Sequence, residues 1–160
     1  MDPKRRLLGH ASRLRGKAAQ LVFEESCSFG GETLFFKIED GGRPAKDAPA
    51  GFVRTKQLCD YIVIIRGQAW FIDVKSFAKP PTRSVFFPKK GKPKTSTQRQ
   101  AANFLTMYYA GYLKAGFMII DNEGGLRPLL GMALFGVYQG RKAPIPRVKK
   151  VADIATMPPA

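Results

Sequence analysis

LCDYIVIIRGQAWFIDVKS, residues 58–76, is the stretch that decides the fold of this chain. β-Branched and aromatic residues fill 61–65 and 69–72, and Gly67 lies between the two runs. Such runs favour strands, and a glycine between them supplies the backbone freedom of a tight turn. The stretch therefore predicts an antiparallel β-hairpin with its turn at 66–68.

Three charged residues interrupt this apolar hairpin: Asp60, Asp73 and Lys75. Side chains two apart on a strand share a face, so Asp73 and Lys75 point the same way. With a two-residue loop at 67–68, Asp60 pairs with Lys75. Ile62 then pairs with Asp73, and the two carboxylates become diagonal neighbours, roughly 7–8 Å apart at the backbone. The pattern predicts all three charged groups on one face, where both carboxylates can reach one small cation.

The whole chain is strongly basic. It has 160 residues, 44% of them hydrophobic, with 27 Lys and Arg against 12 Asp and Glu and a formal net charge of +15. This length and hydrophobic content fit a single domain, 1–160, with its own core. So large a positive excess indicates a polyanionic partner, and we expect nucleic acid. Basic residues concentrate in an N-terminal arm (1–15), a proline-rich loop or stalk (77–95) and a proline-containing C-terminal tail (139–160).

The segments around the hairpin predict a mixed α/β domain. Apolar residues at helical spacing favour a first helix at 16–26, and a second helix begins near Thr95–Thr97, where two capping boxes overlap. Gly116 has the freedom of a helix C-cap and is expected to end the second helix. The other expected elements are strands at 33–39, 117–120 and 132–138, a loop at 40–57 and a turn region at 121–131.

Two features of the sequence bear on the compartment. No apolar run approaches the ~20 residues of a membrane span, and the N-terminus lacks the apolar region of a secretory signal. Cys27 and Cys59 have no metal-binding spacing and are expected to be reduced thiols in or near the core. We therefore expect no membrane association and a cytoplasmic location.

Two aspartates and a lysine that converge at a strand end suit metal-assisted hydrolysis. Carboxylates are hard oxygen ligands, so Asp60 and Asp73 can hold Mg²⁺. Such an ion activates bound water, while Lys75 orients the attacking water or offsets charge in the transition state. A polar residue of the first helix can complete the site. Gln20 and Glu24 are polar residues of that helix and share one of its faces, because they are four apart.

These residues resemble the motifs of the PD-(D/E)XK nuclease superfamily, and most of all those of RecU-type Holliday-junction resolvases of bacteria and their phages. The resemblance covers roughly residues 14–121. It is carried by Gly16-Lys17-Ala18-Ala19-Gln20 on the first helix, Asp60, Asp73-Val74-Lys75, and Gln98 at the start of the second helix. The chain departs from the family pattern at Gln20, where a Glu is common, and at Cys59, which stands in place of a proline.

The resemblance implies a restriction-endonuclease-like core, with a mixed central sheet flanked by helices and one Mg²⁺-dependent site per protomer in which Mn²⁺ substitutes. It also implies a homodimer that makes two symmetric cuts in a four-way DNA junction. The implied catalytic residues are Asp60, Asp73 and Lys75, with Gln20 or Glu24 from the first helix and a motif glutamine that is either Gln98 or Gln100.

The basic segments supply the expected contacts to branched or duplex DNA. The candidate residues are Arg13, Arg15, Lys17, Lys79, Arg83, Lys89, Lys90, Lys92, Lys94 and Arg99. Two other functions stay open: another endonuclease of the same superfamily, acting in restriction, nicking or repair, and a non-catalytic basic nucleic-acid-binding protein. For a resolvase, the compartment would be the bacterial cytoplasm, or the host cytoplasm if a phage encodes the protein.

Overall fold

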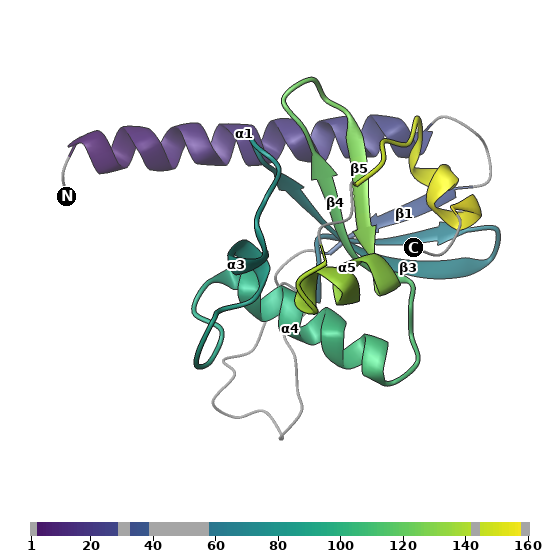
Figure 1. Cartoon of the computed structure of the whole chain (residues 1–160). Coiled ribbons are helices and arrows are strands. Elements are labelled where there is room, and N and C mark those ends of the chain that lie inside the picture. The colour runs from purple at the N-terminus through teal and green to yellow at the C-terminus, as the bar shows by residue number, and fades with distance from the viewer. Residues whose placement is uncertain (1–2, 29–32, 39–57, 142–144, 158–160) are drawn as a thin grey trace, which may run out of the picture.

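The computed structural model describes residues 3–28, 33–38, 58–141 and 145–157, with the side chains of the first helix described from Arg15 to Cys27. It has an α/β fold in which a five-stranded mixed sheet packs against helices (Figure 1). The predicted class, a mixed sheet flanked by helices, is confirmed at this level. The predicted loop at 40–57 lies outside the described residues.

The sheet runs in the simple order β1-β2-β3-β4-β5. Neighbouring strands are antiparallel except β3 and β4, which are parallel because helix α4 carries the chain back between them. The strands are β1 (Thr33–Lys37), β2 (Tyr61–Ile65), β3 (Gln68–Ser76), β4 (Ala115–Ile120) and β5 (Leu126–Leu130).

Helices cover both faces of the sheet. The long helix α1 (Pro3–Ser28) crosses one face, while α3 (Arg83–Phe86), α4 (Ser96–Tyr109) and α5 (Gly131–Tyr138) lie on the other (Figure 1). A 3₁₀-helix, η2 (Val151–Thr156), contacts α1. Among the described helices, none combines the length and the apolar character that a membrane crossing requires.

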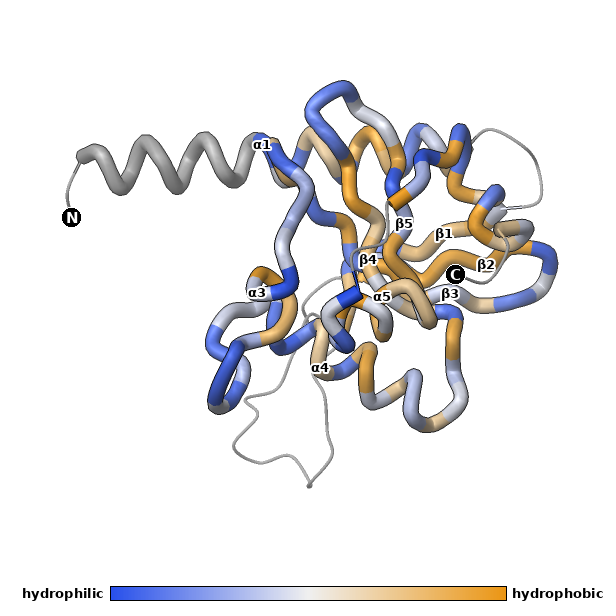
Figure 2. Tube along the Cα trace, in the orientation of Figure 1, coloured by the Kyte–Doolittle hydropathy of each residue, from blue (hydrophilic) through white to orange (hydrophobic). Residues whose placement is uncertain are grey.

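Two layers of apolar side chains fill the space between the sheet and the helices, and hydrophobic residues follow the central strands in Figure 2. Alternation along β3 assigns its residues to these layers: Ile72 and Val74 belong to the layer under α1. Phe71 packs in the other layer, so Asp73 and Lys75, which alternate with Ile72 and Val74, lie on the face covered by α4.

The predicted hairpin is confirmed, but its register is shifted. The turn consists of Arg66 and Gly67, at φ 51° and 78°, in place of the expected loop at 67–68. Two successive positive φ angles are those of a type I′ turn, whose twist suits a two-residue hairpin loop. Each β2 residue therefore pairs two positions earlier on β3 than predicted. A shift of two residues leaves every side chain on the predicted face of the sheet. Asp60 comes level with Asp73, and not with Lys75 as predicted.

The three basic segments, which the sequence predicted as an arm, a loop and a tail, contain helical structure. The basic arm is helical from Pro3, and the first helix is thus longer than the expected 16–26. The loop at 77–95 contains α3, whose Phe86 is buried. In the C-terminal tail, Val148 bridges to Leu126 and η2 buries two apolar side chains, Val151 and Ile154.

Three predictions in the second half are wrong. The second helix ends at Tyr109, and Gly116 lies inside β4, where a Cβ would collide with the Leu129 carbonyl. The expected turn region contains β5, an edge strand that tolerates Pro128. Residues 132–138, expected as a strand, form α5, because a short apolar run does not distinguish a buried helix from a buried strand.

Candidate active site

The site forms where β3 changes its partner. The pairing of β3 with β2 ends at Ile72, and its parallel pairing with β4 continues to Ser76. Beyond Ile72, the edge of β3 that faced β2 no longer bonds to a strand. Asp60, the residue before β2, takes up this position, and its Oδ2 accepts a hydrogen bond of 3.0 Å from the Val74 backbone N–H.

The backbone of Asp60 is fixed from the other side by β1. Its carbonyl oxygen accepts a hydrogen bond of 2.8 Å from the Ile38 N–H, just beyond the end of that strand. Asp60 is thus held between β1 and β3, with its carboxyl close enough to Asp73 to raise the pKa of that residue.

Two further side chains contact the Asp73 carboxylate. Lys75, two residues along the same face, places Nζ 3.0 Å from Oδ2. Gln100 donates from Nε2 to Oδ1 at 2.8 Å and is itself buried in the second turn of α4. The capping box formed by Thr95 and Gln98 fixes where α4 begins, and thereby which residue faces β3.

Asp73 is completely buried, with 0% of its surface exposed. Burial raises the pKa of its carboxyl to about 7; the Lys75 ammonium acts in the opposite direction, and the nearby Asp60 carboxyl raises the pKa further. Two carboxyls that share a small volume cannot both ionise freely. Near neutral pH, the protonated and charged forms of Asp73 are therefore close in free energy, and such a raised pKa is common at catalytic and metal-binding sites.

The oxygen atoms of the site suit a hard divalent cation. Gln100 Oε1 is buried without a hydrogen-bond partner in the described structure, and Asp73 Oδ2 has the Lys75 ammonium as its contact in place of an aligned hydrogen bond. The described residues contain no group of three or more Asp, Glu, His or Cys side chains that could hold a metal. Two carboxylates fit Mg²⁺, which keeps several waters and takes further ligands from a phosphate.

The first-helix candidates, Gln20 and Glu24, do not contact Asp73 in the described structure. The helix that carries them packs on the opposite face of the sheet. Glu24 lies beside the Tyr61 hydroxyl, where burial and then the Glu24 charge raise the pKa of the tyrosine. Neither candidate forms a hydrogen bond or ion pair with Asp60 or Asp73 in the described structure. Their catalytic roles stay predictions.

The two candidate glutamines of α4 have different environments. Gln98 accepts hydrogen bonds from the Lys94 and Thr95 backbone N–H groups and donates to the Ser84 carbonyl, so it links the helix start to α3. Gln100 contacts Asp73. By geometry, Gln100 is the glutamine that contacts Asp73, and Gln98, the other candidate from the sequence, caps the helix.

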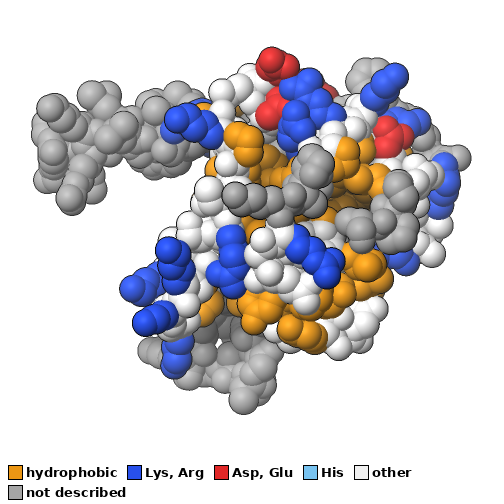
Figure 3. All heavy atoms as spheres, in the orientation of Figure 1, with side chains coloured by type: hydrophobic (Ala, Val, Ile, Leu, Met, Phe, Trp, Pro, Cys, Tyr) orange, Lys and Arg blue, Asp and Glu red, His pale blue; other side chains and the backbone are white. Residues whose placement is uncertain are grey.

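Most of the lysines and arginines that we expect to contact DNA are exposed. The exposed ones are Arg15, Lys17, Lys79, Lys89, Lys90, Lys92, Lys94 and Arg99. Figure 3 shows basic side chains gathered around α3 and the loop that follows it. Arg83 is half-buried, donates to the Tyr138 carbonyl and places its guanidinium over two aromatic rings, while the side chain of Arg13 lies outside the described residues.

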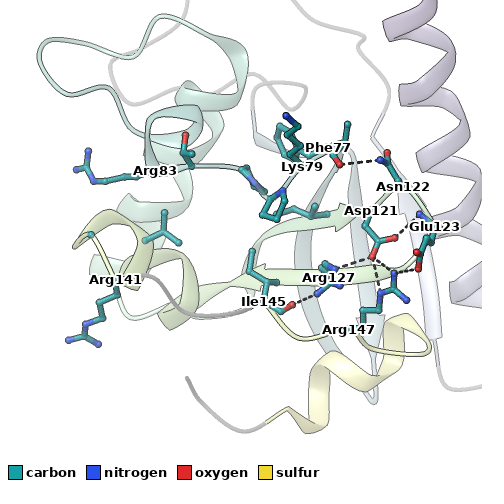
Figure 4. Close-up of a pocket in the computed structure, with 17 residues that line it drawn as sticks. Phe77, Lys79, Arg83, Asp121, Asn122, Glu123, Arg127, Arg141, Ile145 and Arg147 are labelled. Atoms are coloured by element: carbon teal, nitrogen blue, oxygen red, sulfur yellow. Dashed lines mark hydrogen bonds and ion pairs between the residues drawn. The ribbon is translucent and has the colours of Figure 1, made fainter.

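A second polar cluster, centred on Asp121, was not predicted. Its carboxylate accepts hydrogen bonds from the Glu123 N–H group and from Arg127 and Arg147 (Figure 4). It also accepts one from the Gly125 N–H group. Burial acts to raise the pKa of Asp121, but these donors outweigh it and hold the pKa at about 2. The turn sequence at 121–125 was a local signal for part of this cluster, whereas Arg147 reaches it from a distant segment.

No protein-family model, curated protein or solved structure was found to match this chain.

Proposed function

We propose that this chain is a Mg²⁺-dependent endodeoxyribonuclease with a restriction-endonuclease-like core, and that it resolves four-way DNA junctions. The observation that carries the proposal is the convergence of Asp60, Asp73 and Lys75, with Gln100 bonded to Asp73. They come from separate stretches of the chain and include a buried carboxyl of raised pKa. An ordinary surface ion pair lacks this combination, because its carboxylate stays in contact with water and the pair contributes little to stability.

The charge of the chain supports DNA as the substrate. A net charge of +15 is enough to neutralise many phosphates, and exposed lysines follow β3 in the loop before α4. Contacts of this kind hold the phosphate backbone and carry no base sequence. We therefore expect the enzyme to recognise the shape of its substrate, with affinity that falls steeply with salt.

Each residue of the site has a role that follows from its contacts. Asp60 is held in place by the Val74 N–H, and Gln100 fixes the orientation of the Asp73 carboxylate. Lys75 is partly open, with 22% of its side chain exposed, so its ammonium can reach a phosphate oxygen while it still neighbours Asp73. Positive charge at that position stabilises the transition state of phosphodiester hydrolysis.

Asp60 and Asp73 would hold the metal, in agreement with the oxygen atoms available at the site. When bound, Mg²⁺ would lower the pKa of a water molecule and stabilise the negative charge that builds on the phosphate. Asp73 would lose its proton on binding. A homodimer with one such site in each protomer would supply the two symmetric cuts that a junction requires.

Cleavage of synthetic DNA tests the proposal. Wild-type protein with Mg²⁺ should cut a four-way junction with paired, symmetric nicks, and should cut linear duplex and flap substrates more slowly. Asp73→Asn and Lys75→Ala should each lower the rate by at least about 100-fold. Junction binding in EDTA should change little, because the DNA-contacting cations are untouched.

Two remote substitutions serve as matched controls: Asp153→Asn, which retains a capping oxygen, and Lys149→Ala on an exposed residue. Both should cleave like the wild type. Full cleavage by Asp73→Asn would remove the site assignment. Rapid cleavage of linear duplex would instead favour another endonuclease of the same superfamily.

A non-catalytic nucleic-acid-binding protein is the second candidate. It is favoured by the lack of a third acidic ligand among the described residues. Binding of DNA without cleavage in either Mg²⁺ or Mn²⁺, together with no calorimetric signal for metal binding, would select this function.

A further inference from the structure

A pocket opens at the end of β3, on the side of the sheet covered by α3 and α5. Its volume is about 770 Å³, within the range of small-molecule sites. The walls come from the segment after β3 (77–83), the β4–β5 turn, β5, the end of α5 and the chain at Ile145 and Arg147 (Figure 4). No residue of the Asp73 site lines it.

The pocket has a surplus of positive charge. Five basic side chains line it, Lys79, Arg83, Arg127, Arg141 and Arg147, against two acidic ones, Asp121 and Glu123. Arg127 and Arg147 are neutralised by these acids. Lys79 and Arg141 form no ion pair within the described part of the chain, and Arg83 bonds a neutral carbonyl. The surplus charge is therefore available to an anionic ligand.

The charges divide the pocket into two ends. Arg127 and Arg147 surround Asp121 at one end, while Arg83 and Arg141 lie at the opposite end and extend away from that cluster (Figure 4). Between the two ends the walls are apolar. The apolar residues are Phe77, Pro80, Pro81, Ile119, Val137 and Ile145. Such a surface accepts a flat ring, because Phe77 and the prolines offer faces for stacking.

The pocket begins where β3, the strand of the Asp73 site, ends. Residues 71, 73 and 75 share one face of β3, Phe77 follows directly after the strand, and Phe71 and Phe77 both pack in the layer beneath α4. Phe77 follows Asp73 by four residues, which is about 13 Å along a strand. That distance corresponds to about four stacked base steps of DNA. One DNA strand can therefore occupy both places at once.

We propose that this pocket binds an unpaired nucleotide, with its base between the apolar walls and its phosphate at Lys79, while Arg141 adds positive charge at the opposite end. The choice of a nucleotide, among ligands that combine a ring with negative charge, rests on the proposed nuclease function. In that setting the pocket holds a nucleotide that is displaced from the duplex beside the scissile bond. The same chemistry would also bind a free mononucleotide.

Fluorescence anisotropy with a labelled four-nucleotide oligothymidylate, in EDTA, tests the proposal without cleavage. Two variants probe the pocket: the double variant Lys79→Ala/Arg141→Ala removes its unpaired charge, and Ala78→Trp fills it from an exposed position in its lining. Lys149→Ala/Lys150→Ala is the matched control, since it removes the same charge from exposed residues that do not line this pocket. Competition with thymidine 5′-monophosphate and with inorganic phosphate distinguishes a strand, a free nucleotide and a bare anion.

We expect both pocket variants to weaken oligothymidylate binding at least about tenfold and the control to weaken it less than about twofold. Equal losses in the control would show general electrostatic binding and overturn the proposal, as would full competition by phosphate alone. Asp73→Asn should bind the oligonucleotide normally. If that variant still cleaves DNA while the pocket variants lose binding, the proposed nuclease site fails and the pocket stands.

Discussion

Two aspartates near the ends of adjacent parallel strands have opposite electrostatic environments. Asp73 on β3 is fully buried, and its carboxyl has a pKa raised to about 7. Asp121, immediately after β4, accepts hydrogen bonds from two backbone N–H groups and two arginines, and its pKa is lowered to about 2. Both residues have cationic neighbours, so the presence of a partner does not by itself determine the pKa.

The difference lies in burial and in the number of donors. Asp121 lies at the surface in a turn that stabilises its charged form, so it acts as a structural link between β4, β5 and the segment of Arg147. Asp73 has been removed from water, faces a second carboxyl and receives fewer donors. Its charged form destabilises the fold, and such a residue is more consistent with a functional than with a structural role.

The largest expected effect is a pH-dependent gain of stability in Asp73→Asn. A carboxyl whose folded pKa is raised from 3.8 to about 7 destabilises the folded state increasingly as the pH rises through this window. The penalty is absent below about pH 4 and complete above pH 7, where it reaches at most about 4 kcal/mol. Asn removes it and keeps the Gln100 hydrogen bond.

Urea denaturation followed by the fluorescence of the single tryptophan, Trp70, measures this effect. The free energy of unfolding of Asp73→Asn, relative to wild type, should be higher at pH 8 than at pH 4.5. Asp121→Asn should show the opposite sign, a loss of stability at pH 8. A gain for Asp73→Asn that is the same at both pH values would mean that the carboxyl has an ordinary pKa.

The next effect is stabilisation by a divalent metal. Mg²⁺ or Mn²⁺ that binds only the folded state should raise the free energy of unfolding by about 2.7 kcal/mol at 100 times its Kd. Binding displaces the Asp73 proton, so the affinity should be higher at pH 8 than at pH 6. Calorimetric titration at the two pH values measures this. Asp121→Asn should retain the response and Asp73→Asn should lose it. The reverse pattern would show that the metal binds at Asp121 and would contradict the assignment to Asp73.

The sequence was sufficient to predict the hairpin because its strands have strong local signals: two β-branched runs and a glycine. It predicted the face shared by Asp60, Asp73 and Lys75 but not their register, because Arg66 adopts a positive φ that is uncommon outside glycine, asparagine and aspartate. Local patterns also failed at α5, since apolar runs of that length fit either a helix or a strand.

Local sequence patterns could not predict which distant segments contact each other. Gln98 and Gln100 have equally suitable capping partners in the sequence, and only the packing of α4 over β3 determines which one reaches Asp73. In the same way, nothing near Asp121 indicates that Arg147 will contact it. The sequence therefore predicted which residue types form the site better than it predicted which individual residues do.

A smaller effect is expected from the two glutamines of α4. Gln100→Ala removes the hydrogen bond that orients Asp73 and should lower the cleavage rate about tenfold, or about 1.4 kcal/mol. Gln98→Ala removes the side-chain half of the capping box and leaves the hydrogen bond from its backbone N–H to Thr95. It should lower stability by about 1 kcal/mol, with the cleavage rate of the folded protein unchanged. Cleavage rates and urea denaturation of both variants give the comparison. If Gln98→Ala alone lost cleavage, the role that the sequence indicated for Gln98 would be restored.

The smallest effect is expected at Asp121. A carboxylate with a lowered pKa stabilises the fold above its unfolded pKa of 3.8, and this contribution disappears as the pH falls to about 2. Because its arginine partners are more than a third exposed, solvent screening limits the contribution to about 1 kcal/mol. Asp121→Asn keeps an oxygen for the backbone N–H groups and should lose about that amount at pH 7, and less in high salt. Urea denaturation at low and high salt measures the loss. A much larger loss that salt did not reduce would show that Asp121, like Asp73, is effectively buried. The difference in pKa between the two aspartates would then come only from the number of hydrogen-bond donors around each carboxylate.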